Sequence, residues 1–385
     1  MIKIILLLSS LLLAGFLGYR FRRLKEKRLR RYPVSLSRHY FAGLNFLLNE
    51  ETDKAVDVFI KMLAVDNETI ETHLAVGKLF RRRGEVDRAI RIHQHLMTRP
   101  RLTRRLREHA MFELGQDYLS AGMLDRAEQI FIELTQSHSY VKAALKTLID
   151  IYQREKDWEK ALTRAIQYEK ESKQPMQTII AHFYCELALL AFHRGHLEQA
   201  LSSLKAAKEK DEQCMRAYLL QAKINIHQQH YQAALENLQK ISQEPFVHSA
   251  ELIDLLTVCY EHLGLSEQLI TDFQKRLAKH PEVSVAAVLA HHIQKLKGNK
   301  VALLFVADYV RHHPSLRGLF LLVNFYTLTA EDRAKADLAI LQNLITTILS
   351  SKPNYQCQTC GFASHTSHWQ CPKCRAWDTI GVNKV

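Results

Sequence analysis

Residues 114–134 read LGQDYLSAGMLDRAEQIFIEL, and this stretch decides the fold. Its first half carries Gly115 and, three residues later, the aromatic Tyr118. Its second half has Ala127 inside an apolar helical pattern. A small residue lets two helices approach closely, and an aromatic fills the gap against the next helix. The stretch therefore predicts a helix–turn–helix hairpin.

The second half of this stretch recurs along the chain. Each copy has an acidic or polar residue, one or two further residues, an alanine and an apolar helix. The aligned alanines are Ala55, Ala89, Ala127, Ala161, Ala200 and Ala234, and their spacings are 34, 38, 34, 39 and 34 residues. Two degenerate copies follow, with Leu269 and Ala302 at the aligned position.

The preceding helix repeats as well. A small residue lies twelve positions before most aligned positions, at Gly43, Gly77, Gly115, Ala188 and Ala222. An aromatic follows three positions later in most copies, at Phe46, Phe80, Tyr118, Tyr152 and Tyr260. A 34-residue helix–turn–helix period is that of the tetratricopeptide repeat, which stacks into a superhelix with a concave surface. Second helices are expected to end at Pro100, Pro281 and Pro314.

A metal-binding pattern follows the repeats. Two CxxC pairs, Cys357 with Cys360 and Cys371 with Cys374, are separated by ten residues. Two facing knuckles of this kind place four thiolates around one ion, and zinc is the default metal. Iron in the same geometry, as in a rubredoxin electron carrier, stays open, although rubredoxins separate their knuckles more widely. Gly361 follows the second Cys, where the turn is expected to need positive φ.

The segment around these cysteines is too short to form a core of its own. Domains below about 40 residues need a metal or disulfides, so metal binding and folding are one event here. We expect Phe362, Trp369 and Trp377 to pack around the thiolates and exclude water. We expect His365 and His368 to line the loop between the knuckles, because four Cys ligands are already available.

The N-terminal sequence predicts a membrane anchor. Residues 4–19 contain no charge, whereas residues 20–31 hold eight basic residues against one Glu. Basic residues after an apolar run stay in the cytoplasm, which places the body of the protein in the cytoplasm and its N-terminus on the other side of the membrane. A cleaved signal peptide is the alternative, but it carries its charges before the apolar run.

The net charge is +13, and residues 78–107 hold eleven basic residues against two acids. The arginines most closely spaced within this stretch are Arg81, Arg82 and Arg83, together with Arg101, Arg104, Arg105 and Arg107. A solvated face attracted to anionic lipid and a docking face for an acidic partner are both consistent with this run. A nucleic-acid partner is not expected, because no helix-turn-helix or aromatic RNA platform accompanies it.

Catalytic motifs are missing from the sequence, so we expect no enzyme activity, no catalytic residues and no organic cofactor. The pairs His291-His292 and His312-His313 are expected at or near helix ends and in solvent. Cys185, Cys214 and Cys259 are expected to be small buried residues in a reducing compartment.

The order of these modules resembles the lipopolysaccharide assembly protein B family. The ending from Cys371 to Trp377, CPKCRAW, carries the resemblance together with Tyr355-x-Cys357-x-x-Cys360-Gly-Phe. The resemblance implies a single-pass inner-membrane adaptor of Gram-negative bacteria, with its N-terminus in the periplasm. It implies FtsH-mediated degradation of the LpxC deacetylase, and a membrane sensor and other lipopolysaccharide-assembly proteins as partners. The sequence leaves the oligomeric state open, a homodimer included.

We therefore expect an all-α protein with four regions. These are an anchor (1–20), a basic juxtamembrane segment (21–34), a tetratricopeptide array (35–350) and a rubredoxin-like domain (351–385) with one zinc ion on Cys357, Cys360, Cys371 and Cys374. Two other functions stay open. One is an assembly scaffold for envelope biosynthetic enzymes without a role in proteolysis, and the other is a rubredoxin-type redox protein.

Overall fold

The computed structural model describes residues 41–382, apart from residues 47, 50, 64–69, 100–101 and 242–248. The anchor and the basic segment predicted for residues 1–34 lie outside the described residues, as do Pro100 and Arg101. Within the described part, none of the helices combines the length and the apolar character that crossing a membrane requires.

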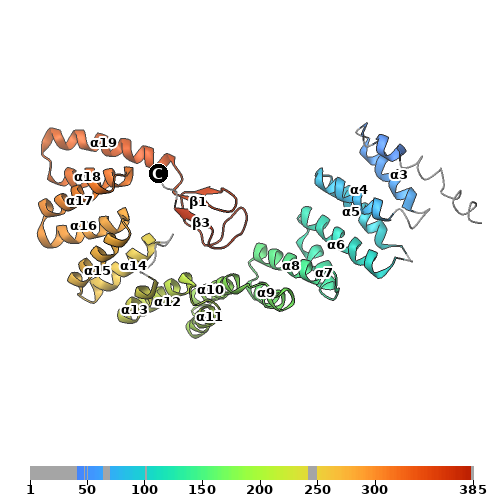
Figure 1. The fold of residues 1–385 in the computed structure, drawn as a ribbon, viewed down its shortest axis with the longest axis horizontal. Helices are drawn as coiled ribbons and strands as arrows, with labels where there is room; N and C mark the ends of the chain where they lie inside the picture. The colour runs from blue at the N-terminus through green and yellow to red at the C-terminus, as the bar shows by residue number, and fades with distance from the viewer. Residues whose placement is uncertain are drawn as a thin grey trace, which may run out of the picture. The chain divides into compact units, whose positions relative to one another are not determined.

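The described chain is a succession of helical hairpins that ends in a small antiparallel sheet (Figure 1). The helices are α3 (Thr52–Leu63), α4 (Ile70–Arg82), α5 (Val86–Met97), α6 (Arg104–Ser120), α7 (Leu124–Leu134), α8 (Val141–Glu155), α9 (Trp158–Ser172), α10 (Gln177–His193), α11 (Leu197–Lys210), α12 (Met215–His227), α13 (Tyr231–Ile241), α14 (Ser249–His262), α15 (Ser266–Lys279), α16 (Val283–Lys297), α17 (Asn299–His312), α18 (Leu316–Thr329) and α19 (Asp332–Ser351).

The chain forms two compact units that divide after Arg154. The first unit contains α3 to α8 among its described residues, and the second contains α9 to α19 and the sheet. The division falls within the predicted hairpin of α8 and α9, whereas the other predicted hairpins lie within one unit. The last hairpin, α18 with α19, was not recognised as a copy in the sequence.

The aligned residues lie on the buried face of the second helix of each hairpin. Every one of them is fully buried, with an exposed fraction of 0%, from Ala55 to Ala302 and including Leu269. The glycines of the preceding helices are needed because the second helix packs directly against them. A Cβ atom on Gly115 would lie 2.8 Å from the Phe131 ring, and one on Gly77 would lie 2.4 Å from the His93 ring. The predicted close approach of the paired helices is confirmed.

In six hairpins the turn uses one residue in the left-handed conformation, five positions before the aligned residue; the turn between α16 and α17 uses Gly298, four positions before Ala302. The residues of the six hairpins have φ between 57° and 84° and are Gly84, Gly122, Lys156, Gly195, Gln229 and Gly264. Glycine adopts this conformation without strain, whereas other residues pay about 1 kcal/mol or more. The helices α15 and α17 end before Pro281 and Pro314, as predicted.

The C-terminal ribbon is a three-stranded sheet of β1 (Tyr355–Cys357), β2 (Ala363–Ser364) and β3 (Ile380–Val382). The strand order is β2-β1-β3, and both pairings are antiparallel. Gln356 of β1 pairs with Ala363 of β2 and with Gly381 of β3. β1 leads directly into the first CxxC turn, because its last residue is Cys357.

Candidate metal centre

The two CxxC turns have the same backbone structure. In the first, the Gly361 amide donates to the Cys357 carbonyl at 2.9 Å; in the second, the Arg375 amide donates to the Cys371 carbonyl at 2.8 Å. Both closing residues are left-handed, with φ of 72° at Gly361 and 57° at Arg375. The prediction of positive φ at Gly361 is confirmed, and the equivalent position in the second turn is occupied by an arginine.

These turns bring the four sulfur atoms together. The sulfur atoms of Cys357, Cys360, Cys371 and Cys374 all lie within 4.8 Å of one another. Cys357 Sγ is 3.7 Å from Cys374 Sγ, and Cys360 Sγ is 3.6 Å from Cys371 Sγ. Four thiolates at tetrahedral positions about 2.3 Å from one ion lie about 3.8 Å apart, so the observed cluster fits such an ion.

Neighbouring groups change the pKa values of the cysteine thiols. The Thr379 hydroxyl lies 3.3 Å from Cys357 Sγ and, with the backbone amides of Cys360 and Thr359, lowers the pKa of Cys357 to about 6. For Cys374, the Ala376 amide lowers the pKa, but burial and the three neighbouring sulfurs outweigh it and raise the pKa to about 12. Four thiolates therefore need a positive charge among them, which a bound metal ion supplies.

The histidines of the loop are not part of the sulfur cluster. His368 Nε2 lies 3.2 Å from Ser364 Oγ and 3.1 Å from Thr366 Oγ1, so it orders the loop. Among the described residues, the group able to hold a metal consists of cysteines alone. This arrangement agrees with the expectation that His365 and His368 line the loop.

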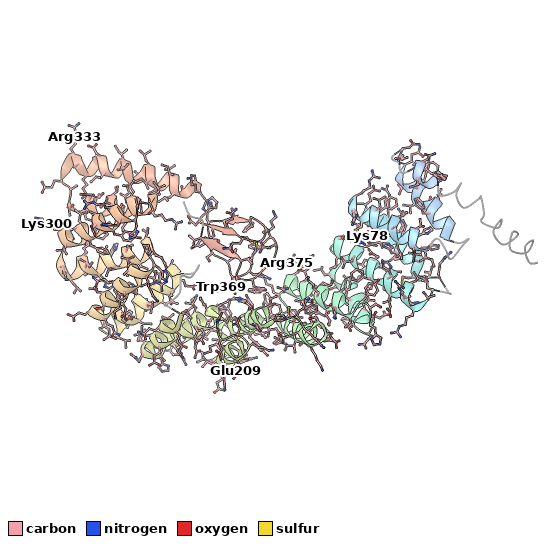
Figure 2. The ribbon with its side chains drawn as sticks, viewed as in Figure 1. Lys78, Glu209, Lys300, Arg333, Trp369 and Arg375 are labelled. Atoms are coloured by element: carbon pink, nitrogen blue, oxygen red, sulfur yellow. The ribbon has the colours of Figure 1, made fainter. Side chains whose placement is uncertain are left out.

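The tryptophans of the ribbon face the repeats, and the prediction that Trp369 and Trp377 surround the thiolates was wrong. Trp377 stacks on the buried His182 of α10, with ring centroids 4.6 Å apart and planes at 15°. Trp369 packs against the core of the repeats (Figure 2). Phe362 does pack beside the cysteine cluster, as predicted.

Polar and cation–π contacts also join the ribbon to α10 and α12. His182 Nε2 lies 2.6 Å from Asp378 Oδ2, and His182 is only 1% exposed. The guanidinium of Arg216 on α12 lies 5.8 Å from the centre of the Trp369 ring and 5.7 Å from that of Trp377. Cations over indole faces are attracted by the ring quadrupole. The ribbon is therefore docked on α10 and α12 of its own unit.

A large cavity lies beside the docked ribbon. Its volume is about 1230 Å³, and residues of α14, α16, α18, α19, β1 and β3 line it. Most of its walls are apolar, with Phe320, Leu321 and Leu349 from the helices and Val382 from the ribbon. Both modules of the second unit therefore contribute to one concave surface.

Comparison with known proteins agrees with this architecture. Residues 355–381 match the family model described as the rubredoxin metal binding domain, and residues 72–108 match a tetratricopeptide repeat model. Lipopolysaccharide assembly protein B of Escherichia coli strain K12 is 37% identical over 368 residues, which are 95% of each chain. The protein of the same name from Haemophilus influenzae is 33% identical and covers 99% of this chain and 98% of its own.

The chain belongs to the lipopolysaccharide assembly protein B family. The resemblance inferred from the CPKCRAW ending is confirmed. Among solved structures, a tetratricopeptide repeat protein from Parabacteroides merdae aligns with 68% of this chain and all of its own, at 16% identity and a TM-score of 0.33.

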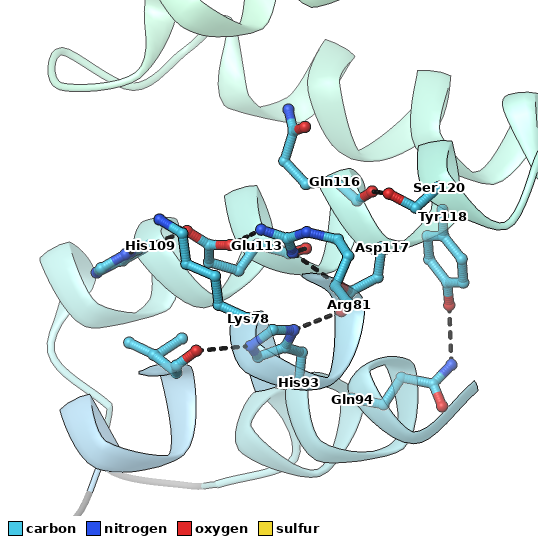
Figure 3. Close-up of polar contacts among 11 residues, drawn as sticks. Lys78, Arg81, His93, Gln94, His109, Glu113, Gln116, Asp117, Tyr118 and Ser120 are labelled. Carbon is cyan, nitrogen blue, oxygen red and sulfur yellow. Dashed lines mark hydrogen bonds and ion pairs between the residues drawn. The ribbon is translucent and has the colours of Figure 1, made fainter. Parts of the chain in front are cut away.

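The basic run of this lipopolysaccharide assembly protein B family member is only partly a solvated face. Arg82, Arg83, Arg104, Arg105 and Arg107 are exposed. Arg81 differs, because its side chain is 14% exposed and donates to Glu113 Oε2 at 2.5 Å and to Asp117 Oδ1 at 2.6 Å (Figure 3). The other oxygen of the fully buried Asp117 contacts His93 Nδ1. Arg81 is thus a core residue that joins α4, α5 and α6.

The two histidine pairs also differ from each other. His312 and His313 lie at the end of α17 and are exposed, as predicted. The prediction for His292 was wrong: it lies inside α16, is 5% exposed, and burial lowers its pKa. Burial disfavours the charged imidazolium, and Glu261, with its carboxylate 3.9 Å from His292 Nε2, offsets this effect only in part.

Proposed function

We propose that this protein regulates lipopolysaccharide assembly as a non-catalytic adaptor. One observation carries the proposal: the identity with lipopolysaccharide assembly protein B of Escherichia coli extends over 95% of both chains. The similarity therefore includes the repeats and the ribbon together. Stacked helical repeats present extended concave surfaces to partners, which is what an adaptor requires.

In finer detail, we propose that the adaptor presents the LpxC deacetylase to the FtsH membrane protease. The predicted anchor of residues 1–20 supports this step physically. Tethering two components to one membrane raises their effective concentration, so a weakly held substrate meets the protease often. A membrane sensor that controls the adaptor completes the proposal, with the body of the protein in the cytoplasm.

The cavity beside the ribbon is the surface that we propose for partner binding. Its apolar walls are typical of sites that receive apolar side chains, and its polar groups can orient them. Arg317 donates to Asn354 Oδ1 at 2.6 Å, which places a cation among the lining residues. Because β1 and β3 form part of the wall, loss of the ribbon removes part of this surface.

The ribbon is proposed to hold one zinc ion through Cys357, Cys360, Cys371 and Cys374. When bound, zinc supplies the positive charge that keeps four thiolates together and fixes the ribbon fold. Metal analysis of the purified protein tests the assignment. One zinc per chain and a colourless solution support it, whereas one iron per chain and a red solution favour the redox alternative.

A pull-down tests the adaptor proposal. The tagged protein is recovered from membranes that contain FtsH, with and without LpxC, and both proteins are quantified. The proposal predicts recovery of the protease, and recovery of the deacetylase with it. Recovery of biosynthetic enzymes without the protease supports the assembly scaffold instead. A chain that lacks residues 1–20 is expected to be cytosolic and to recover less protease; equal recovery from the cytosol overturns the tether.

A further inference from the structure

Two cysteines outside the ribbon lie in contact. Cys185 is on α10, and Cys214 is the residue that caps the N-terminus of α12. Their sulfur atoms are 3.9 Å apart, although 28 residues separate them in sequence. Cys185 is 0% and Cys214 is 5% exposed. Both belong to the second unit, so their separation is fixed within one compact body.

The surroundings allow these sulfur atoms to approach further. Both cysteines belong to one core cluster of α10, α11 and α12, and much of this cluster is alanine, including Ala181 and Ala217. A disulfide bond is about 2.05 Å long, so closing it requires a movement of about 2 Å shared between two side chains. Rotation about the side-chain torsions of small, unbranched cysteines achieves part of this movement.

The two thiols differ in character. The two sulfur atoms lie within hydrogen-bond distance, and this contact with Cys185 lowers the pKa of Cys214. The Ala217 amide also lowers it, as expected for a cysteine at a helix N-terminus. The pKa of Cys185 is raised well above its ordinary value by the same contact and by burial. The position of Cys214 at the N-terminus of α12 therefore favours it as the nucleophile of the pair.

We propose that Cys185 and Cys214 form a redox-active dithiol, a modification site that hydrogen peroxide or an organic hydroperoxide converts into a reversible disulfide. The Cys214 thiolate attacks the peroxide, a sulfur–oxygen bond forms and the oxygen–oxygen bond breaks. The sulfur is oxidised to sulfenic acid, and the peroxide is reduced to hydroxide or alkoxide. The Cys185 sulfur then attacks Cys214, the sulfur–sulfur bond forms, and the sulfenic oxygen leaves as water with the Cys185 proton.

The site lies next to the contact that docks the ribbon. Arg216, two residues after Cys214, is the cation that lies over the rings of Trp369 and Trp377. It also donates to Glu186 on α10 at 2.8 Å, one residue after Cys185. A disulfide here joins α10 covalently to the start of α12, beneath the ribbon.

Mass spectrometry of the purified full-length protein, with its metal bound, tests the proposal. The protein is exposed to hydrogen peroxide, its remaining thiols are blocked with N-ethylmaleimide, and it is digested with trypsin. Cleavage after lysine and arginine places Cys185 in residues 174–194 and Cys214 in residues 211–216, each with a single cysteine. We expect a linked pair of these two peptides, which separates after treatment with dithiothreitol.

Cys259 provides an internal control, because it is also fully buried and burial raises its pKa to about 11. We expect Cys259 to remain a thiol and Cys259→Ala to give the same linked pair as the unmodified chain. Cys185→Ala removes the second thiol, so Cys214 is expected to accumulate as sulfenic acid that dimedone captures.

Two results overturn the proposal. One is a folded, metal-bound chain that yields no linked pair while peroxide oxidises its methionines. The other is a linked pair that forms only after tryptophan fluorescence reports loss of the fold, because the bond then arises from unfolded chains. If Cys185→Ala does not fold, the unmodified chain and Cys259→Ala decide the question.

Discussion

Single residues set the geometry of each repeat, and the left-handed turn position is the clearest case. Gly122 has φ of 73°, and a Cβ added there meets no other atom within 4 Å. A substitution at this position therefore changes backbone strain and not packing. Gln229 occupies the equivalent position of another hairpin, with φ of 62°.

We predict opposite responses at these two positions. Gly122→Ala is expected to lower the free energy of unfolding by about 1 kcal/mol, because alanine is strained at positive φ. Gln229→Gly is expected to leave it unchanged or raise it by up to about 1 kcal/mol, because strain is relieved. Urea unfolding followed by circular dichroism measures both. Equal losses in the two variants contradict the assignment of a left-handed turn.

The ion pairs of Arg81 with Glu113 and Asp117 in the first unit give a pH-dependent prediction. Burial alone would raise the pKa of Glu113, but hydrogen bonds and charge from Arg81 outweigh burial and lower it below its ordinary value of 4.5. The unfolded chain thus binds a proton more readily than the folded one. The stabilisation is fully present above about pH 4.5 and is lost as the pH falls below that value.

We therefore expect Glu113→Gln to lower the free energy of unfolding at pH 7 by about 1.5–3 kcal/mol, as for a hydrogen bond to a charged group. Below pH 4.5 the variant and the unmodified chain should converge. Glu133→Ala, at an exposed position of α7, is the control and should change stability by less than about 0.5 kcal/mol. A difference that stays constant down to pH 3 contradicts the role given to the Glu113 carboxylate.

The sequence predicted which positions are small and buried, because periodicity at 34 residues reports packing within one hairpin. It did not reveal the roles of Arg81, His292 or the Cys185–Cys214 pair. Their partners lie on other helices, and a residue type alone does not name its partner. Arg81 stands in a run of exposed arginines, and only the fold places Asp117 and Glu113 beside it.

At the scale of elements, the ribbon and its docking helices act together. The chain has three tryptophans, Trp158, Trp369 and Trp377, and all of them lie where the ribbon meets α9, α10 and α12. Intrinsic fluorescence therefore reports this contact without a label. Two of the three tryptophans, Trp369 and Trp377, lie in the short ribbon. This concentration of large apolar side chains is the feature of the sequence that could have predicted the docking.

We predict that His182→Ala loosens the ribbon. The substitution removes the ring that stacks on Trp377 and the contact to Asp378, and it leaves a cavity in the interface. Tryptophan emission should shift to longer wavelength, and a protease should cleave between α19 and β1 more rapidly. His193→Ala, at the exposed end of the same helix, should do neither. Unchanged emission and cleavage in His182→Ala contradict the docking.

At the scale of the whole molecule, the order of modules was predictable because each module carries its own local pattern. The cysteine spacing predicts the ribbon, and the alanine period predicts the hairpins. The division into two units and the face of the ribbon that meets the repeats depend on contacts between distant segments, and no local pattern encodes them. The anchor of residues 1–20 and the proposed partners remain predictions.

The central claim is that a metal-dependent ribbon, docked on the repeats, is required for regulated turnover of the deacetylase. The most direct measurement is the half-life of LpxC in cells that carry Cys371→Ser, with Cys259→Ser as the matched control. We predict loss of the metal and a half-life several-fold longer than in the control. A half-life equal to that of the control, in a variant shown to lack the metal, contradicts the claim.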